Sequence, residues 1–201
     1  MGTEAIQGAE RPLGLILAGG RGRRMGGRDK GLIEYRGRAL VTWPLAALAA
    51  VTPDVVISAN RNSEDYARLG HPVIADRLTD FQGPLAGIAA AQAACPGRSL
   101  LVAPCDAPAA TPELFERLLA ALAGGATAAV AHDGERLQPT FAALAADSAT
   151  ALQDWLARGE RGLGAFFEHI GAAHCDCSDH PEWFDNLNRP QDLHAGTGVS
   201  S

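Results

Sequence analysis

The residues best suited to chemistry stand together in one glycine-rich loop near the start of the chain. Gly19 and Gly20 follow an apolar run from Leu13 to Ala18, and cationic side chains come after them: Arg21, Arg23, Arg24, Arg28 and Lys30. Glycine lets backbone N–H groups approach a ligand closely, and successive N–H groups form a concavity that binds anions. The loop therefore predicts a polyphosphate site in which cations neutralise phosphate charge.

Two better-known phosphate loops do not match this spacing. A P-loop ends in Gly-Lys followed by Ser or Thr, whereas Lys30 follows Asp29 and precedes Gly31. A dinucleotide-binding loop needs a glycine where Met25 stands, three residues after Gly22. The plainer alternative is a solvated connection whose arginines only maintain solubility. We favour the polyphosphate site, because the strand, the glycine pair, the cations and the lysine occur in that order.

Carboxylates follow two other apolar runs. Asp106 comes after Ser99–Ala103, and Asp76 comes after Pro72–Ala75. In open α/β sheets, ligands bind outside the carboxyl ends of the strands. The Mg²⁺ that accompanies a triphosphate prefers one or two carboxylates plus phosphate oxygens and water, so we predict Asp106 as a Mg²⁺ ligand. The alternatives are a turn cap at Asp106 and a surface ion pair between Asp76 and Arg77.

Apolar runs alternate with helical patterns along most of the chain, which predicts one α/β domain with a mainly parallel sheet. Strands are expected at Leu13–Ala18, Asp54–Ala59, Pro72–Ala75, Ser99–Ala103, Ala126–Ala131, Pro139–Leu144 and Ala172–Cys177. Helices are expected at Leu40–Val51, Ser63–Leu69 (with Ser63 as the N-cap), a stretch ending near Ala94, Thr111–Ala123, Asp147–Arg158 and Gly164–Ile170. The two strands joined by residues 132–136 predict an antiparallel strand in the sheet. Residues 12–195 are expected to form the domain, between flexible segments at 1–11 and 196–201.

Composition narrows the class of protein. The chain has 201 residues, of which 47% are apolar and 20% charged, as in a single domain with a full core. Its net charge of −6 argues against a nucleic-acid partner bound by general electrostatics. We identify no signal peptide and no apolar run of membrane-spanning length, so we expect no membrane partner and a cytoplasmic location. The cysteines are too scattered for a disulfide scaffold, and Cys175 and Cys177 belong more simply to a strand than to a metal site.

The glycine-rich loop resembles the signature of a known family. Leu17-Ala18-Gly19-Gly20, then Arg24-Met25-Gly26 and Asp29-Lys30, is similar to the motif of nucleotidyltransferases that load a nucleoside monophosphate onto a phosphorylated acceptor. The resemblance is to the molybdenum cofactor guanylyltransferases of the MobA type, and it extends from Leu13 to about Leu193. Further matches lie at strand ends and at a helix start: Val73–Asp76, Gly83–Gly87 and Pro104–Asp106. The resemblance implies a three-layer, Rossmann-like nucleotidyltransferase fold of the GT-A kind, with helices on both faces of the sheet.

The same resemblance implies a reaction and the residues that serve it. Such enzymes use Mg²⁺ and transfer GMP from GTP to the terminal phosphate of molybdopterin carrying molybdenum, releasing pyrophosphate. The implied catalytic residues are Arg24, Lys30 and Asp106. The implied GTP-binding residues are Leu17, Ala18, Gly19, Gly20, Lys30, Asp76, Asp106 and one or both of Ser58 and Asn60, because Ser58 replaces a frequent asparagine. The implied acceptor-binding residues are Arg161, Asn186 and Asn188.

Two other functions stay open on the sequence alone. The same fold could serve a cytidylyltransferase or a sugar-phosphate nucleotidyltransferase, which a panel of nucleotides would distinguish. It could also serve a non-catalytic nucleotide-binding module, although Lys30 and Asp106 are both present. We expect GTP and Mo-molybdopterin as small-molecule partners, a monomeric chain, and transient contact with molybdenum-insertion enzymes and molybdoenzymes.

Overall fold

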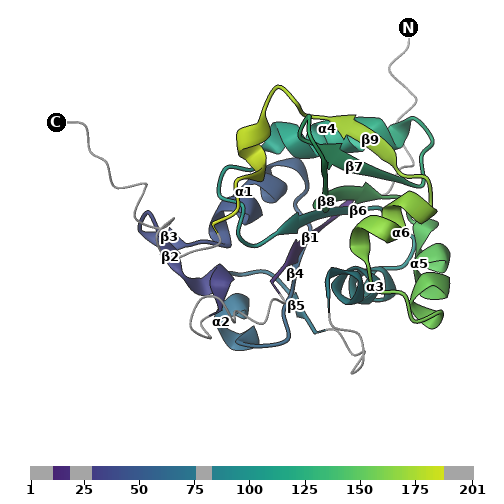
Figure 1. Cartoon of the computed structure of the whole chain (residues 1–201). Helices are drawn as coiled ribbons and strands as arrows, with labels where there is room; N and C mark the ends of the chain where they lie inside the picture. The colour runs from purple at the N-terminus through teal and green to yellow at the C-terminus, as the bar shows by residue number, and fades with distance from the viewer. Residues whose placement is uncertain (1–10, 19–28, 76–82, 188–201) are drawn as a thin grey trace, which may run out of the picture.

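A seven-stranded sheet forms the middle layer of the structure, a computed structural model that describes residues 11–18, 29–75 and 83–187 (Figure 1). The strand order is β5-β4-β1-β6-β8-β7-β9. The strands are β1 (Leu13–Leu17), β4 (Val55–Ser58), β5 (Val73–Ile74), β6 (Leu100–Pro104), β7 (Ala128–His132), β8 (Leu137–Leu144) and β9 (Ala173–Asp176). The strands described for this sheet run in one direction except for β8, which is antiparallel to β6 and β7.

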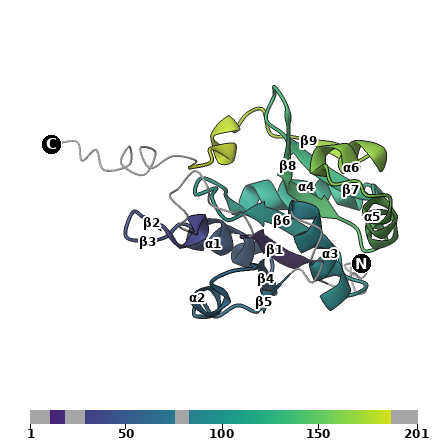
Figure 2. The ribbon, with the colours of Figure 1, turned by 60° about the horizontal axis from the view of Figure 1, so that its bottom comes forward.

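Helices cover both faces of the sheet. They are α1 (Thr42–Val51), α2 (Ser63–Ala67), α3 (Pro84–Ala94), α4 (Pro112–Ala123), α5 (Ser148–Ala157) and α6 (Leu163–His169), with short 3-10 turns η2 (Lys30–Leu32) and η3 (Pro181–Phe184). Buried residues of α1 and α4 pack on one face, and those of α3, α5 and α6 pack on the other. Figures 1 and 2 show these two helical layers with the sheet between them.

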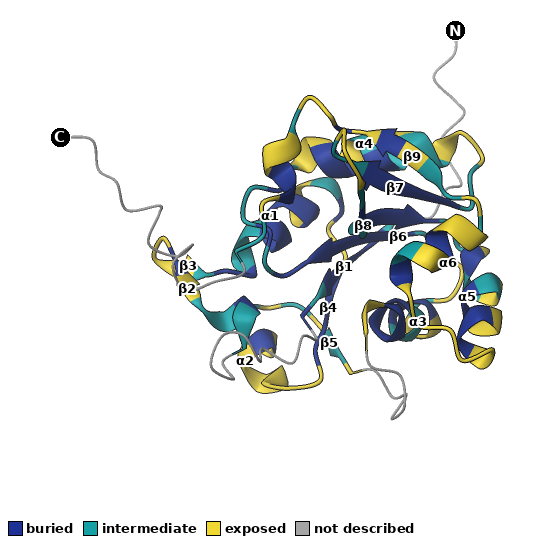
Figure 3. Ribbon diagram, viewed as in Figure 1, coloured by how far each residue is buried: buried dark blue, intermediate teal, exposed yellow. Residues whose placement is uncertain are grey.

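Covering both faces explains why the strands are almost continuously apolar. Successive side chains of a strand point to opposite faces. Along β1, Leu13 and Leu15 accordingly pack with α3, α5 and α6, whereas Ile16 packs with α1 and α4. Figure 3 shows the central strands buried and the helices exposed on the side away from the sheet.

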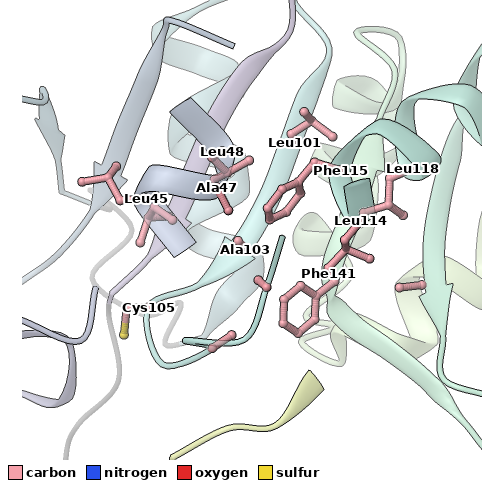
Figure 4. Close-up of a cluster of buried hydrophobic side chains, with 14 of the residues drawn as sticks. Leu45, Ala47, Leu48, Leu101, Ala103, Cys105, Leu114, Phe115, Leu118 and Phe141 are labelled. Carbon is pink, nitrogen blue, oxygen red and sulfur yellow. The ribbon is translucent and has the colours of Figure 1, made fainter. Parts of the chain in front are cut away.

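Part of the hydrophobic core lies between α1, β6 and α4. Leu48, Leu101 and Phe115 converge there, and each is 0% exposed (Figure 4). Cys105 and Ala107 are both buried, at 8% and 0% exposure. Asp106 stands between them just beyond the end of β6, and its side chain is 16% exposed at the edge of the sheet.

The predicted α/β fold with a mainly parallel sheet is confirmed, and the predicted antiparallel pair is β7 and β8. The N-cap prediction for Ser63 is wrong, because α2 begins at Ser63 and its N-cap is Asn62, with a left-handed φ of 52°. The sequence also does not predict a short hairpin of β2 (Glu34–Tyr35) and β3 (Arg38–Ala39). Its turn needs positive φ at Arg36 (50°), where turns usually carry Gly, Asn or Asp.

The predicted flexible segments, apart from Arg11, lie outside the described residues. Across the part of the chain that is described, no helix combines the length and the apolar character that a membrane span would need.

Candidate functional site

The carboxyl ends of β1, β4 and β6 lie side by side. Leu17 pairs in register with Ser58 of β4 and with Pro104 of β6. The backbone N–H of Ala18 donates to the Ser58 carbonyl at 2.9 Å, and the N–H of Cys105 donates to the Leu17 carbonyl at 3.1 Å. These strands are parallel, so the residues that follow them emerge at one edge of the sheet. Ala18, Asn60 and Asp106 are therefore brought to a common edge.

Lys30 and Asp106 form an ion pair at this edge. The Lys30 Nζ donates to Asp106 Oδ2, joining η2 to the end of β6 across 76 residues of sequence. Both side chains are sheltered, with exposed fractions of 19% and 16%. A charge-assisted hydrogen bond in such a setting is stronger than the same bond in water. The edge thus holds a cation and a carboxylate side by side, as a polyphosphate with its counter-ion requires.

The residues beside Lys30 fix the position of η2. Asp29 is the N-cap of η2, and its carboxylate accepts hydrogen bonds from the Tyr66 hydroxyl at 2.5 Å and from Asn62 Nδ2 at 3.1 Å. No local pattern predicts a role for Tyr66 or Asn62, because both lie more than 30 positions from Asp29 in the sequence. A single buried tyrosine in a short helical pattern carries no sequence signal for this contact.

The glycine-rich start of α3 packs on the edge where β1, β4 and β6 end, from the face that α3, α5 and α6 cover. A Cβ on Gly87 would lie 2.7 Å from Ser58 Oγ and 2.9 Å from Leu17 Cδ2, so only glycine fits there. Pro84 occupies the first turn of α3, where a missing N–H costs nothing. Ser58 is accordingly buried under the helix at 5% exposure, whereas Asn60 is exposed at the edge.

The residues predicted for the acceptor fall into two settings. The N–H of Leu187 donates to the Asp106 carbonyl at 3.2 Å, so the segment after η3 returns to Asp106. Asn186 precedes Leu187 in this segment. The Arg161 guanidinium instead donates to the carbonyls of Leu156 (3.2 Å) and Glu160 (2.7 Å), at the C-terminal end of α5. Cations favour this end of a helix.

The β7–β8 turn satisfies its own polar groups. The Asp133 carboxylate accepts hydrogen bonds from the N–H groups of Glu135 and Arg136, both at 2.8 Å, and from Gln138 Nε2 at 2.6 Å. The backbone N–H of Arg136, followed by Gln138 and Glu135, holds the pKa of Asp133 at about 2. This carboxylate is therefore ionised throughout the neutral range, and its hydrogen bonds stabilise the turn that contains it.

Three cysteines lie in the core. Cys105 is a free thiol in the core cluster that includes residues of α1 and α4, and burial, with the neighbouring Asp106 charge, raises its pKa above the usual range. Cys175 and Cys177 are also buried, with their Sγ atoms 3.9 Å apart on the same face of the chain at β9.

Comparison with known proteins gives a consistent answer. Residues 14–175 match the family model of the MobA-like NTP transferase domain. Molybdenum cofactor guanylyltransferase from Ectopseudomonas mendocina is 40% identical over 183 residues, covering 91% of this chain and 90% of that protein. The enzyme of the same name from Mannheimia succiniciproducens is 43% identical over 182 residues, covering 90% and 96%. The chain belongs to the molybdenum cofactor guanylyltransferase family.

Solved structures agree with this family at the level of the fold. Molybdopterin-guanine dinucleotide biosynthesis protein A from Archaeoglobus fulgidus has a TM-score of 0.74 and 26% identity, covering 91% of this chain and 95% of its own. A cytidylyltransferase acting on 2-C-methyl-D-erythritol 4-phosphate, from Thermus thermophilus, has a TM-score of 0.66 at 18% identity. The similarity to the cytidylyltransferase is one of fold only. Members of the family are nucleotidyltransferases, and the three-layer architecture predicted from the sequence is theirs.

Asp106 fits a Mg²⁺ ion that substrate phosphates help to hold. Mg²⁺ is usually bound through one or two carboxylates plus phosphate oxygens and water, not by an all-protein cage. Within residues 11–18, 29–75 and 83–187, no group of three or more His, Cys, Asp or Glu side chains is arranged to hold a metal. Asp106, a carboxylate at the strand edge with a 16% exposed side chain, suits a Mg²⁺ ion that is held mainly by phosphate oxygens and water.

Several predicted residues lie outside the described part of the chain: Gly19, Gly20, Arg24, Asp76 and Asn188. The described ones that the fold brings to the edge where β1, β4 and β6 end are Leu17, Ala18, Lys30, Ser58, Asn60 and Asp106. Their roles stay predictions, and the arrangement of the edge is what supports them.

Proposed function

We propose that this protein transfers GMP from GTP to the terminal phosphate of Mo-molybdopterin, releasing pyrophosphate and forming the guanine dinucleotide cofactor. The observation that carries the proposal is the Lys30–Asp106 pair at the edge where β1, β4 and β6 end. The choice of guanine and of a molybdopterin acceptor comes from the family, whose named members are 40% and 43% identical to this chain.

In the proposed reaction the acceptor phosphate attacks the α-phosphorus of GTP. One P–O bond forms to the acceptor, the bond between the α- and β-phosphates breaks, and pyrophosphate leaves. The acceptor phosphate is already ionised near neutral pH, so the protein needs no nucleophilic side chain. Its task is to position the reactants and to stabilise the charge that develops.

Each nucleotide residue has a part in that task. Lys30 and Arg24 neutralise phosphate charge, and Leu17, Ala18, Gly19 and Gly20 hold the nucleotide through their backbone. Asp76 contacts the nucleotide, and Asn60 is a better candidate than Ser58, because Ser58 is buried beneath Gly87. Asp106 would hold Mg²⁺, which supplies charge neutralisation for the triphosphate when bound.

Residues that bind the acceptor are proposed in relation to the same edge, where β1, β4 and β6 end. Leu187 hydrogen bonds to the backbone of Asp106, so the flanking Asn186 and Asn188 are candidates to bind the pterin phosphate near the transferred group. Arg161 closes the end of α5 with its guanidinium, so it would act on the acceptor by shaping this loop.

The decisive experiment has two steps. Calorimetric titration with GTP, CTP, ATP and UTP, each with Mg²⁺, should give clear preference for GTP. Pyrophosphate release should then require both Mg²⁺ and Mo-molybdopterin. Preference for CTP would move the protein to a cytidylyl activity on the same fold, and GTP binding without pyrophosphate release would favour a non-catalytic module.

The proposal extends to a cytoplasmic, monomeric enzyme that meets molybdenum-insertion enzymes and molybdoenzymes only transiently. Light scattering on the purified chain at micromolar concentration should give the mass of one chain, 20.9 kDa. A stable mass of twice that value would contradict the monomer.

A further inference from the structure

The carboxylate of Asp29 connects Lys30 to a different part of the fold. It accepts the Tyr66 hydroxyl at 2.5 Å on Oδ1, Asn62 Nδ2 at 3.1 Å on Oδ2 and the Gly31 N–H at 3.3 Å on Oδ1. The first two donors belong to α2 and its N-cap, and the third belongs to η2. Lys30 stands between Asp29 and Gly31, so these bonds hold the backbone on both sides of it.

The Tyr66 side of this arrangement is rigid. Tyr66 is 0% exposed and is among the largest fully buried side chains of the described chain. A Cβ on Gly31 would lie 2.5 Å from the Tyr66 hydroxyl oxygen and 3.3 Å from the Cys105 Cβ. Because glycine has no Cβ, η2 can approach the Tyr66 side chain this closely. The hydroxyl therefore reaches η2 at a defined point between Lys30 and the core.

The properties of Tyr66 and Asn62 favour a fixed position of the Asp29 carboxylate that they bind. Burial, with contributions from Cys105 and from the hydrogen bond to Asp29, raises the pKa of Tyr66 above its usual range, so the hydroxyl stays protonated and donates. Asn62 adopts φ 52°, which is uncommon for a residue other than glycine and is best tolerated by Asn and Asp. This backbone turn accompanies the bond from the Asn62 amide to Asp29.

We propose that Tyr66 and Asn62, acting through Asp29, are positioning residues that hold Lys30 against Asp106 for phosphoryl chemistry. The chain of contacts runs from α2 to Asp29, through the η2 backbone to Lys30, and from Lys30 to Asp106. The kinetic part of this inference rests on the proposed guanylyl transfer, whereas the placement of Lys30 does not.

Placement can be measured without any nucleotide, because Lys30 is the only lysine in the chain. An amine-selective acylating reagent therefore reports on one side-chain amine, with the N-terminal amine as an internal standard. Tyr66→Phe removes only the hydroxyl, and Lys30 should then react roughly five-fold faster relative to the N-terminal amine, as loss of a hydrogen bond of ordinary net strength implies. An unchanged ratio would overturn the inference even if the enzyme proves fully active.

Kinetics then separate positioning from general support of the fold. Tyr66→Phe should lower kcat for GMP transfer about ten-fold while KM for GTP changes less than about two-fold, because the cation is displaced and not lost. Tyr35→Phe, in the β2–β3 hairpin, is the matched control and should leave kcat unchanged. If the wild-type protein transfers no GMP, the proposed function fails, and the acylation result still decides the placement.

A double-mutant cycle closes the test. In a Lys30→Gln background, Tyr66→Phe should change kcat less than about two-fold, because residues that act through one another are not additive. A full further ten-fold loss would show that Tyr66 acts independently of Lys30 and would overturn the inference. Should Tyr66→Phe fail to fold, Asn62→Ala at the exposed end of the network provides the same cycle.

Discussion

Two sets of polar contacts in the described structure are built in opposite ways. At the edge where β1, β4 and β6 end, side chains join segments that are far apart: Lys30 and Asp106 are 76 residues apart, and Asp29 and Tyr66 are 37 apart. At the β7–β8 turn and the end of α5, side chains bind their own neighbours. Asp133 reaches residues two to five positions away, and Arg161 reaches one and five positions back.

The difference separates two uses of a polar side chain. A local hydrogen bond shapes the turn that contains it, and its loss is confined to that turn. A contact between distant segments depends on the whole sheet and brings charges together that would otherwise lie apart. We therefore expect substitutions of the polar side chains at the strand edge to change catalysis with little change in stability, and substitutions of the locally bonded side chains to do the reverse.

Asp106 should give the largest effect. Asp106→Asn keeps the size of the side chain but removes the charge that faces Lys30 and the proposed Mg²⁺, so GMP transfer should fall by on the order of 10³-fold with the fold intact. Pyrophosphate release and circular dichroism would measure the two properties. The matched control is Asp54→Asn, which breaks a 2.8 Å ion pair with Arg98 at the other end of β4. Turnover of Asp106→Asn near that of the wild type would remove Asp106 from the site.

Lys30 should come next. Lys30→Gln removes the cation and should reduce kcat about 100-fold, comparable with loss of one electrostatic donor in other active sites. Lys30→Arg keeps the charge in a larger planar group and should recover only part of the rate. Equal rates for Lys30→Gln and Lys30→Arg would show that restoring the positive charge recovers no activity, and would contradict this expectation.

Gly87 tests the packing that shapes the edge. Alanine in place of a helix glycine normally stabilises, but the Gly87→Ala Cβ would crowd Ser58 Oγ and Leu17 Cδ2, so we expect a loss of about 1–3 kcal/mol in unfolding free energy. Urea denaturation measures this loss. Gly164→Ala in α6 is the matched control: its Cβ would lie 3.7 Å from Pro139 Cγ, and it should gain about 0.5–1 kcal/mol. If both substitutions changed the unfolding free energy in the same direction, the packing explanation for Gly87 would be wrong.

Asp133 should affect stability at low pH more than activity. Its pKa is lowered from 3.8 to about 2, so the stability that it contributes is present above about pH 4 and is lost as the pH falls toward 2. Thermal unfolding of Asp133→Asn should therefore change less with pH between 4 and 2 than that of the wild type. GMP transfer at neutral pH should stay within about two-fold. Glu135→Gln, an exposed carboxylate of the same turn, is the control.

Most of the fold could be predicted from local patterns. Apolar runs such as Leu13–Ala18 and the Thr111-Pro112 helix start carry their own signals, and the strands and helices lie where these signals indicate. The β2–β3 hairpin carries no such signal, because its turn uses Arg36 at positive φ. Ser63 was predicted as a cap from its type, but the chain turns one residue earlier, where Asn62 adopts a left-handed conformation and reaches Asp29.

The class of chemistry could be predicted from the amino-acid sequence, because a glycine loop with cations and a carboxylate after an apolar run are each local features. Which of these groups meet depends on the tertiary fold. Strand order places β1 between β4 and β6, and this order brings Asp106 to Lys30 and Tyr66 to Asp29. The physical reason is that strand order follows from how the whole chain buries its apolar surface, which no short stretch encodes.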